Sequence, residues 1–129
     1  MKAKELRIGN YINHGTELIK VESIHTSKDD ALINFDWEWN YFTSIVHCQP
    51  IPLTEKWLKK LGFKYSEERA SMSNGFEEWE NNGIYIGPLD NDNYISEALD
   101  QGGINQPIKY IHQLQNLYFA LTGNELEIK

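Results

Sequence analysis

The stretch "QPIKYIHQLQNLYFALTGNEL", residues 106–126, has the periodicity of an amphipathic helix. At 100° per residue, its main apolar side chains fall within an arc of about 120°. Pro107 fits the first helical position, where its missing N–H costs nothing, and Gly123 fits the left-handed position that ends a helix. The stretch therefore predicts a helix that closes a hydrophobic core. The predicted arc consists of Tyr110, Ile111, Leu114, Leu117, Tyr118 and Leu121.

The opposite side of this predicted helix is polar. We expect His112 to be half-exposed there, because it lies between Phe119 and Asn116 on the helical wheel. No second His, Cys or carboxylate lies three or four residues from His112, so the helix offers no metal site. Gln113 and Asn116 are spaced to face a partner, although such residues are more often part of a solvated face.

The segment "PLTEKWLKKLGF", residues 52–63, predicts a short helix. Thr54 is a good N-cap, and Gly62 fits the left-handed position after the last turn. Lys59 and Lys60 lie in that last turn, where cations suit the helix dipole. Before this segment, four β-like runs within about fifty residues predict a small β-sheet or an SH3-like barrel. These runs are "LRIGNYI", "ELIKVESIH", "ALINF" and "SIVHCQPIPL".

After the short helix, Asn82-Gly83 is a strong hairpin signal between residues 76–80 and 84–87. The run "NYISEAL" that follows is compatible with a third strand or a short helix. The predicted fold is therefore α+β: a small β module, a short helix, a β-meander and a C-terminal helix packed on a sheet. We expect one domain over residues 1–129, with sub-halves at 1–52 and 53–129.

Three blocks of the chain resemble a known family. They are "LRIGNYI", "PIPLTEKWLKKLGF" and the stretch "IKYIHQLQNLYFALTG", residues 108–123. In the same order, they are similar to blocks of short, uncharacterised proteins from Bacteroidetes genomes and their phages or mobile elements. The resemblance implies a bacterial or phage protein, with a minor virion component as one alternative. It supplies no cofactor and no catalytic residue.

The location that the sequence predicts is the cytoplasm of a bacterial host or phage-infected cell. The single cysteine, Cys48, excludes an intramolecular disulfide, which fits a reducing compartment. The first residues are charged and lack the apolar run of a signal peptide. No segment approaches the roughly 20 apolar residues of a membrane span.

The aromatic stretch "FDWEWNYF", residues 35–42, is the most unusual part of the composition. If it is extended, Phe35, Trp37, Trp39 and Tyr41 face one way. Such rings hold single-stranded nucleic acid when Lys and Arg accompany them, but the interleaved charges here are acidic. Two interpretations remain: the rings cover a core edge or hairpin, or they form a protein-binding patch, since Trp and Tyr dominate interface hot spots.

The net charge of −7 lies in the second half of the chain. Residues 1–62 carry eight basic and eight acidic side chains, whereas residues 67–100 carry nine acidic side chains and only Arg69 as a basic one. This half would repel a phosphate backbone and attract a basic partner, although a solvated acidic face is the simpler interpretation. The acidic candidates for partner binding are Glu77, Glu78, Glu80, Asp90 and Asp92.

No complete catalytic or metal-binding pattern is present. The run "DNDNYISEALDQ" begins like a calcium loop but has Ile95 in place of the turn glycine and Gln101 in place of the bidentate glutamate. His47 and Cys48 are neighbours on a predicted strand, so their side chains point to opposite faces. No phosphate-binding loop or nucleophile elbow occurs. We therefore expect neither a cofactor nor a metal, and no enzyme.

The leading hypothesis is a non-enzymatic accessory module that binds a protein partner, with a basic protein as one option. It would use the aromatic stretch or the acidic face, with no direct contact to nucleic acid or membrane. The alternative to it, besides a minor virion component, is an acidic nucleic-acid mimic that inhibits a basic protein. In that case its carboxylates would stand where phosphates bind.

Overall fold

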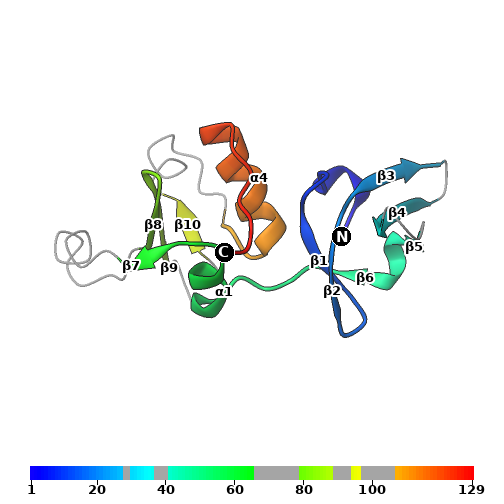
Figure 1. Cartoon of the computed structure of the whole chain (residues 1–129), viewed down its shortest axis with the longest axis horizontal. Helices are drawn as coiled ribbons and strands as arrows, with labels where there is room; N and C mark the ends of the chain where they lie inside the picture. Colours follow the sequence, from blue (N-terminus) through cyan, green and yellow to red (C-terminus); the bar gives the residue numbers. More distant parts are fainter. Residues whose placement is uncertain (28–29, 37–40, 66–78, 89–93, 97–106) are drawn as a thin grey trace. The chain divides into compact units, whose positions relative to one another are not determined.

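The computed structural model describes residues 1–27, 30–36, 41–65, 79–88, 94–96 and 107–129 (Figure 1). The chain divides into two compact units. The first unit comprises Met1–Pro52 and Tyr110–Glu125, and the second comprises Leu53–Lys109 and Leu126–Lys129. Along the chain, the first boundary between the two units therefore falls after Pro52. The sequence suggests the boundary between two sub-halves at the same place. The C-terminal helix, however, belongs to the first unit and not to the second.

The first unit contains two three-stranded antiparallel sheets, of order β2-β1-β6 and β3-β4-β5. Two short 3-10 helices, η1 and η2, complete its N-terminal part. The elements are η1 (Ala3–Glu5), β1 (Tyr11–His14), β2 (Glu17–Lys20), β3 (Ser23–Thr26), β4 (Ala31–Asp36), β5 (Tyr41–Ser44), η2 (Ile45–His47) and β6 (Cys48–Gln49).

One continuous segment, β2 and β3, serves both sheets. Val21 donates its N–H to the carbonyl of Asn10 at 2.9 Å, and the next residue, Glu22, donates to the carbonyl of Asn34 at 2.8 Å. The chain thus changes partner within one peptide unit. After η2, the last strand returns to pair with β1. Two sheets that share a bent strand, with a 3-10 turn before the last strand, form the strand order of an SH3-like barrel, the second of the two expected architectures.

The core of this unit forms where the inward faces of the two sheets meet. Ile12 and Ile19 are opposite each other in the register of β1 and β2, and both are buried. Each such side chain contributes roughly 1.5–3 kcal/mol relative to an exposed one, so a core of this kind is stable without a disulfide. The buried cluster consists of Leu6, Ile12, Ile19, Val21, Ile33 and Cys48.

The second unit begins with α1 (Glu55–Lys60), and both predicted caps are confirmed. The hydroxyl of Thr54 accepts from the N–H of Trp57 at 3.3 Å. Gly62 has φ +88°, and Phe63 donates its N–H to the carbonyl of Leu58 at 2.9 Å. These bonds satisfy backbone groups that the helix ends would otherwise leave unpaired.

The β-meander of the second unit is also confirmed, as a four-stranded antiparallel sheet of order β10-β9-β8-β7. Asn82 and Gly83 both have positive φ, 50° and 83°, as a two-residue hairpin turn of the favoured hand requires. Residues 94–96 of the run that was compatible with either a strand or a helix are a strand. The strands are β7 (Lys64–Tyr65), β8 (Trp79–Asn81), β9 (Ile84–Pro88) and β10 (Tyr94–Ser96).

The C-terminal helix α4 (Ile111–Thr122) contacts β1, as the predicted packing of a helix on a sheet requires. Its expected start at Pro107 is wrong. The residues before the helix are extended, because Ile108 and Tyr94 exchange backbone hydrogen bonds of 2.6 and 2.8 Å. The side chain of Gln113 instead caps the helix by accepting from the N–H of Tyr110 at 3.0 Å. Gly123 ends it with φ +75°, as expected.

The buried face of α4 is rotated from the predicted arc. Leu121, expected inside, is 46% exposed, whereas His112, expected to be half-exposed, is 2% exposed. Polar side chains therefore enter the core side of this helix, which a count of apolar residues alone does not anticipate. The buried residues of α4 are Ile111, His112, Leu114, Gln115 and Tyr118.

Candidate functional site

The outward face of the sheet β3-β4-β5 exposes a small apolar patch. Leu32 is 43% exposed and Phe42 is 48% exposed, although both are large apolar side chains on strands. His25 is opposite Leu32 in the register, and its ring centroid lies 5.6 Å from that of Phe42. We call these three side chains, His25, Leu32 and Phe42, the outer patch.

The outer patch faces outward because successive side chains of a strand point to opposite faces of the sheet. In β4, Ala31 and Ile33 are buried, so Leu32 between them faces outward. In β5, Thr43 is buried and its hydroxyl lies 3.1 Å from Nε2 of His14, so its neighbour Phe42 faces outward. The inward side chains thus fill the core while Leu32 and Phe42 remain exposed, although Asn34, two residues after Leu32 on β4, is buried.

The described ends of the aromatic stretch that contributes Phe42 lie on two antiparallel strands, β4 and β5. Phe35 lies at the end of β4, and Tyr41 begins β5, where its backbone pairs with Asp36. The alternative of a hairpin is the one that the strands support. Phe35 packs against the core cluster, with its ring centroid 5.8 Å from that of His14. Trp37 and Trp39 lie outside the described residues.

Phe42 was not among the sequence-predicted contact residues, although its ring is exposed. The pairing register of β4 with β5 shifts between Asn34 and Asp36, and the two strands run in opposite directions. Both features change which side chains share a face of the sheet. The regular alternation of aromatic and polar residues in the stretch does not distinguish a hairpin from one long strand.

Of the acidic candidates, only Glu80 lies within the described residues. It is half-buried in β8, and its carboxylate accepts from the N–H of Gly83 at 2.8 Å. This bond supports the hairpin turn, so a structural role explains Glu80. The other four candidates, Glu77, Glu78, Asp90 and Asp92, lie outside the described residues.

A hollow of about 500 Å³ lies in the second unit, between α1 and the strands β7 and β8. The centroids of the Tyr65 and Trp79 rings are 5.7 Å apart, with an interplanar angle of 71°. The Nζ atom of Lys59 lies 5.8 Å from the ring centroid of Trp79, within cation–π range. The hollow is lined by Glu55, Lys59, Phe63, Lys64, Tyr65 and Trp79, and we call it the α1–β8 hollow.

Sequence reasoning did not find the α1–β8 hollow. Lys59 was explained by the helix dipole alone, and Trp79 is separated from it by twenty residues of chain. The available signal was the charge pattern. Residues 56–64 contain four lysines and no acidic residue, in a chain whose net charge is −7. Such a basic segment in an acidic protein indicates a local surface that attracts negatively charged groups.

Amide side chains of the first unit form a network of internal hydrogen bonds. Asn116, which the sequence left as a possible partner contact, donates to the carbonyl of Glu5 at 2.8 Å and accepts from the side chain of Asn10 at 2.9 Å. Its oxygen also accepts from Nη1 of Arg7 at 3.1 Å. The guanidinium of Arg7 stacks 4.0 Å from the ring centroid of Phe119. These internal contacts explain Asn116, so no contact with a protein partner is needed to explain it.

Two buried titratable side chains are also in the first unit. Burial lowers the pKa of His112, and the nearby carboxylate of Glu5 opposes part of that change. Neither ring nitrogen of His112 has a hydrogen-bond partner among the described residues, and its ring stacks on that of Tyr110 at 5.8 Å. Burial raises the pKa of the Cys48 thiol, which makes it a poor nucleophile.

Within the described residues, no group of three or more His, Cys, Asp or Glu side chains is arranged to hold a metal ion. No helix in that part of the chain has the length and apolar character needed to cross a membrane. Comparison of the chain with protein-family models, with curated proteins and with solved structures finds no match.

Proposed function

We propose that this chain is a non-enzymatic protein-binding module of bacterial or phage origin, which docks a protein partner on the outer patch. The observation that carries the proposal is the exposure of Leu32 and Phe42 on adjacent strands of one sheet. Single exposed apolar side chains are ordinary, but neighbours that form one apolar surface are typical of interaction sites. An aromatic ring at such a surface is typical of an interface hot spot.

Charge supports the choice of a protein partner over nucleic acid. The net charge of −7 of the whole chain disfavours a phosphate backbone as its partner. A patch of three side chains is smaller than a stable dimer interface, so the complex would be transient or would recruit further surface.

The test compares a double variant, Leu32→Thr with Phe42→Thr, with the control Leu18→Thr. Threonine retains the β preference of both positions, and Leu18 is 45% exposed on β2, in the other sheet of the same unit. Affinity capture at physiological salt from the native host should retain a protein on the wild type and the control. The double variant should lose it, while its circular dichroism and thermal unfolding stay unchanged.

Retention of the same protein by the double variant would reject the outer patch as the contact surface. A captured basic protein that is lost at higher salt, and lost by the triple variant Glu77→Gln, Glu78→Gln and Glu80→Gln, would instead support the nucleic-acid mimic. Capture of nothing by the wild type at physiological salt would count against both functions.

A further inference from the structure

The α1–β8 hollow belongs to the second unit, and the proposed docking on the outer patch makes no use of it. Its volume is about 500 Å³, and it is open to solvent along one side. All its lining residues come from α1, from β7 and β8, or from the turn between α1 and β7.

The inner wall of the hollow is aromatic and held in place by secondary structure. Phe63 is 2% exposed and Trp79 is 5% exposed, so both are fixed by packing, whereas Tyr65 remains 43% exposed. Phe63 is positioned by its bond to the C-terminal turn of α1, and Trp79 is opposite Tyr65 in the pairing of β7 and β8. The buried rings therefore fix the base of the hollow, and the ring of Tyr65 supplies the exposed aromatic surface that an apolar group would contact.

The rim of the hollow is charged and predominantly basic. Lys59 and Lys64 are both exposed, and neither ammonium group forms an ion pair within the described part of the chain. Glu55 is the single carboxylate among the lining residues. Two cations that form no ion pair with another described residue, beside an apolar wall, complement a ligand that combines an apolar group with negative charge.

We propose that the α1–β8 hollow binds an acidic peptide segment of a protein partner. One aromatic or large aliphatic side chain of the segment enters the hollow, and the carboxylates next to it meet Lys59 and Lys64. A peptide fits better than a small molecule because all three charged lining residues are exposed. A small ligand would stay largely in water there, whereas a peptide continues across the rim on both sides.

The experiment titrates the full-length ¹⁵N-labelled protein with a short capped peptide that has a phenylalanine between pairs of acidic residues. Two comparison peptides replace the phenylalanine with alanine or the acidic residues with their amides. We expect the first peptide to shift the indole N–H signal of Trp79 and the amide signal of Phe63. Both comparison peptides should bind at least about tenfold more weakly, because each lacks one of the two complementary features.

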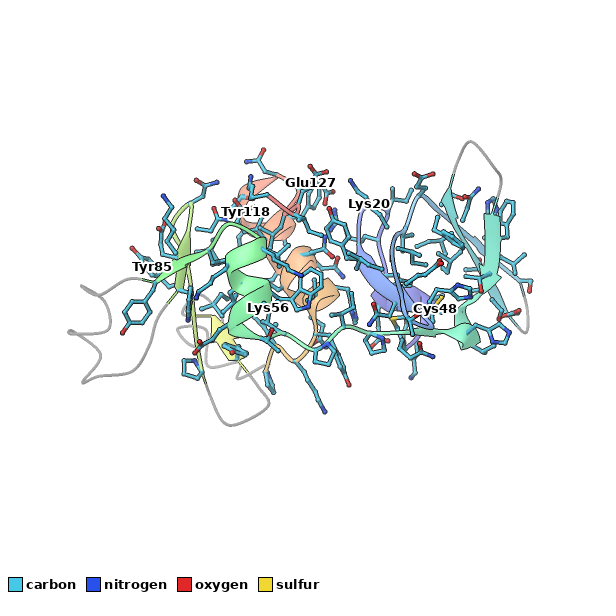
Figure 2. All side chains as sticks on the ribbon, turned by 60° about the horizontal axis from the view of Figure 1, so that its bottom comes forward. Lys20, Cys48, Lys56, Tyr85, Tyr118 and Glu127 are labelled. Carbon is cyan, nitrogen blue, oxygen red and sulfur yellow. The ribbon has the colours of Figure 1, made fainter. Side chains whose placement is uncertain are left out.

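Two double variants that remove the same amount of charge distinguish binding at the hollow from general electrostatic attraction. Lys59→Gln with Lys64→Gln removes the rim charges, whereas Lys56→Gln with Lys60→Gln removes two lysines of α1 that do not line the hollow (Lys56 is labelled in Figure 2). At physiological salt, where charges more than about 8 Å apart are screened, the first pair should lose about tenfold in affinity and the second less than about twofold.

Equal losses in the two variants would overturn the proposal in favour of nonspecific attraction. Equal binding of the alanine peptide or of the uncharged peptide would also overturn it, as would binding of none of the three. The variant Leu32→Thr with Phe42→Thr should bind the peptide like the wild type. Failure at the hollow is therefore distinguishable from failure of the outer patch.

Discussion

The side-chain oxygen of Gln115 accepts a hydrogen bond of 2.8 Å from the backbone N–H of Tyr11, a residue 104 positions earlier in the chain. The amide nitrogen of the same side chain donates to the carbonyl of Gly9 at 3.0 Å. One fully buried amide thus pairs with the backbone on both sides of Asn10. The helix α4 is therefore joined to the start of β1 by directional bonds as well as by apolar packing.

The first prediction concerns these two bonds. Gln115→Met keeps the length of the side chain but leaves the N–H of Tyr11 and the carbonyl of Gly9 without this partner. A buried group left unpaired costs roughly 1–3 kcal/mol, so we expect the free energy of unfolding to fall by about 2–5 kcal/mol. Urea unfolding followed by circular dichroism measures it. Gln49→Met, on an exposed position of β6, is the control and should change stability by less than about 0.5 kcal/mol.

The second prediction tests the rotated face of α4. Leu114 is fully buried, and Leu114→Ala should cost roughly 2–5 kcal/mol through lost burial and a residual cavity. Leu121, which the helical wheel placed in the same arc, is 46% exposed, so Leu121→Ala should cost less than about 1 kcal/mol. Equal losses in urea unfolding would restore the predicted arc. A negligible loss for Leu114→Ala would indicate that this face is not core.

The features that sequence reasoning predicted correctly depend on local chemistry. Each of these features acts on backbone only a few residues away. They are the hydroxyl of Thr54, the left-handed glycines Gly62 and Gly123, and the pair Asn82-Gly83. Their effect on the backbone is nearly independent of the rest of the protein. The α+β class and the order of strands and helices follow from such signals and from apolar periodicity.

The features that were missed depend on contacts between distant segments. Pro107 does not begin the helix, because Ile108 forms a bridge with Tyr94 that a periodicity count does not include. His112 is buried because α4 turns a partly polar face inward, where Gln115 has its own partners. The α1–β8 hollow joins residues from α1 and β8, so its aromatic wall exists only after the second unit folds.

The third prediction concerns Cys48, which is 7% exposed in the core of the first unit and is labelled in Figure 2. Burial raises the pKa of its thiol, so both access and thiolate content are low at neutral pH. We expect the native protein to react with a disulfide reagent more than about tenfold more slowly than the urea-unfolded protein. Because the chain has one cysteine, absorbance of the released thiolate counts a single site. Equal rates would mean that this core opens readily.

The fourth prediction rests on the burial of His112. Burial lowers the pKa of this side chain in the folded state below its ordinary value of 6.5, because the low-dielectric core disfavours the imidazolium. The unfolded chain then binds a proton more readily than the folded one between those two pKa values. Stability from this residue is complete above about pH 6.5 and falls as the pH decreases toward the folded-state pKa. The pKa of Glu5 is also lowered, so its titration lies below this window.

The comparison of wild type with His112→Phe isolates this effect, since phenylalanine keeps a ring beside Tyr110 but binds no proton. Urea unfolding from pH 8 to pH 5 should show wild-type stability decreasing below pH 6.5, with a slope of at most about 1.4 kcal/mol per pH unit. The variant should lack this component, while the other histidines contribute equally to both proteins and cancel. Parallel pH profiles would show that folding does not lower the pKa of His112, as expected if its imidazole were solvated or paired in the folded state.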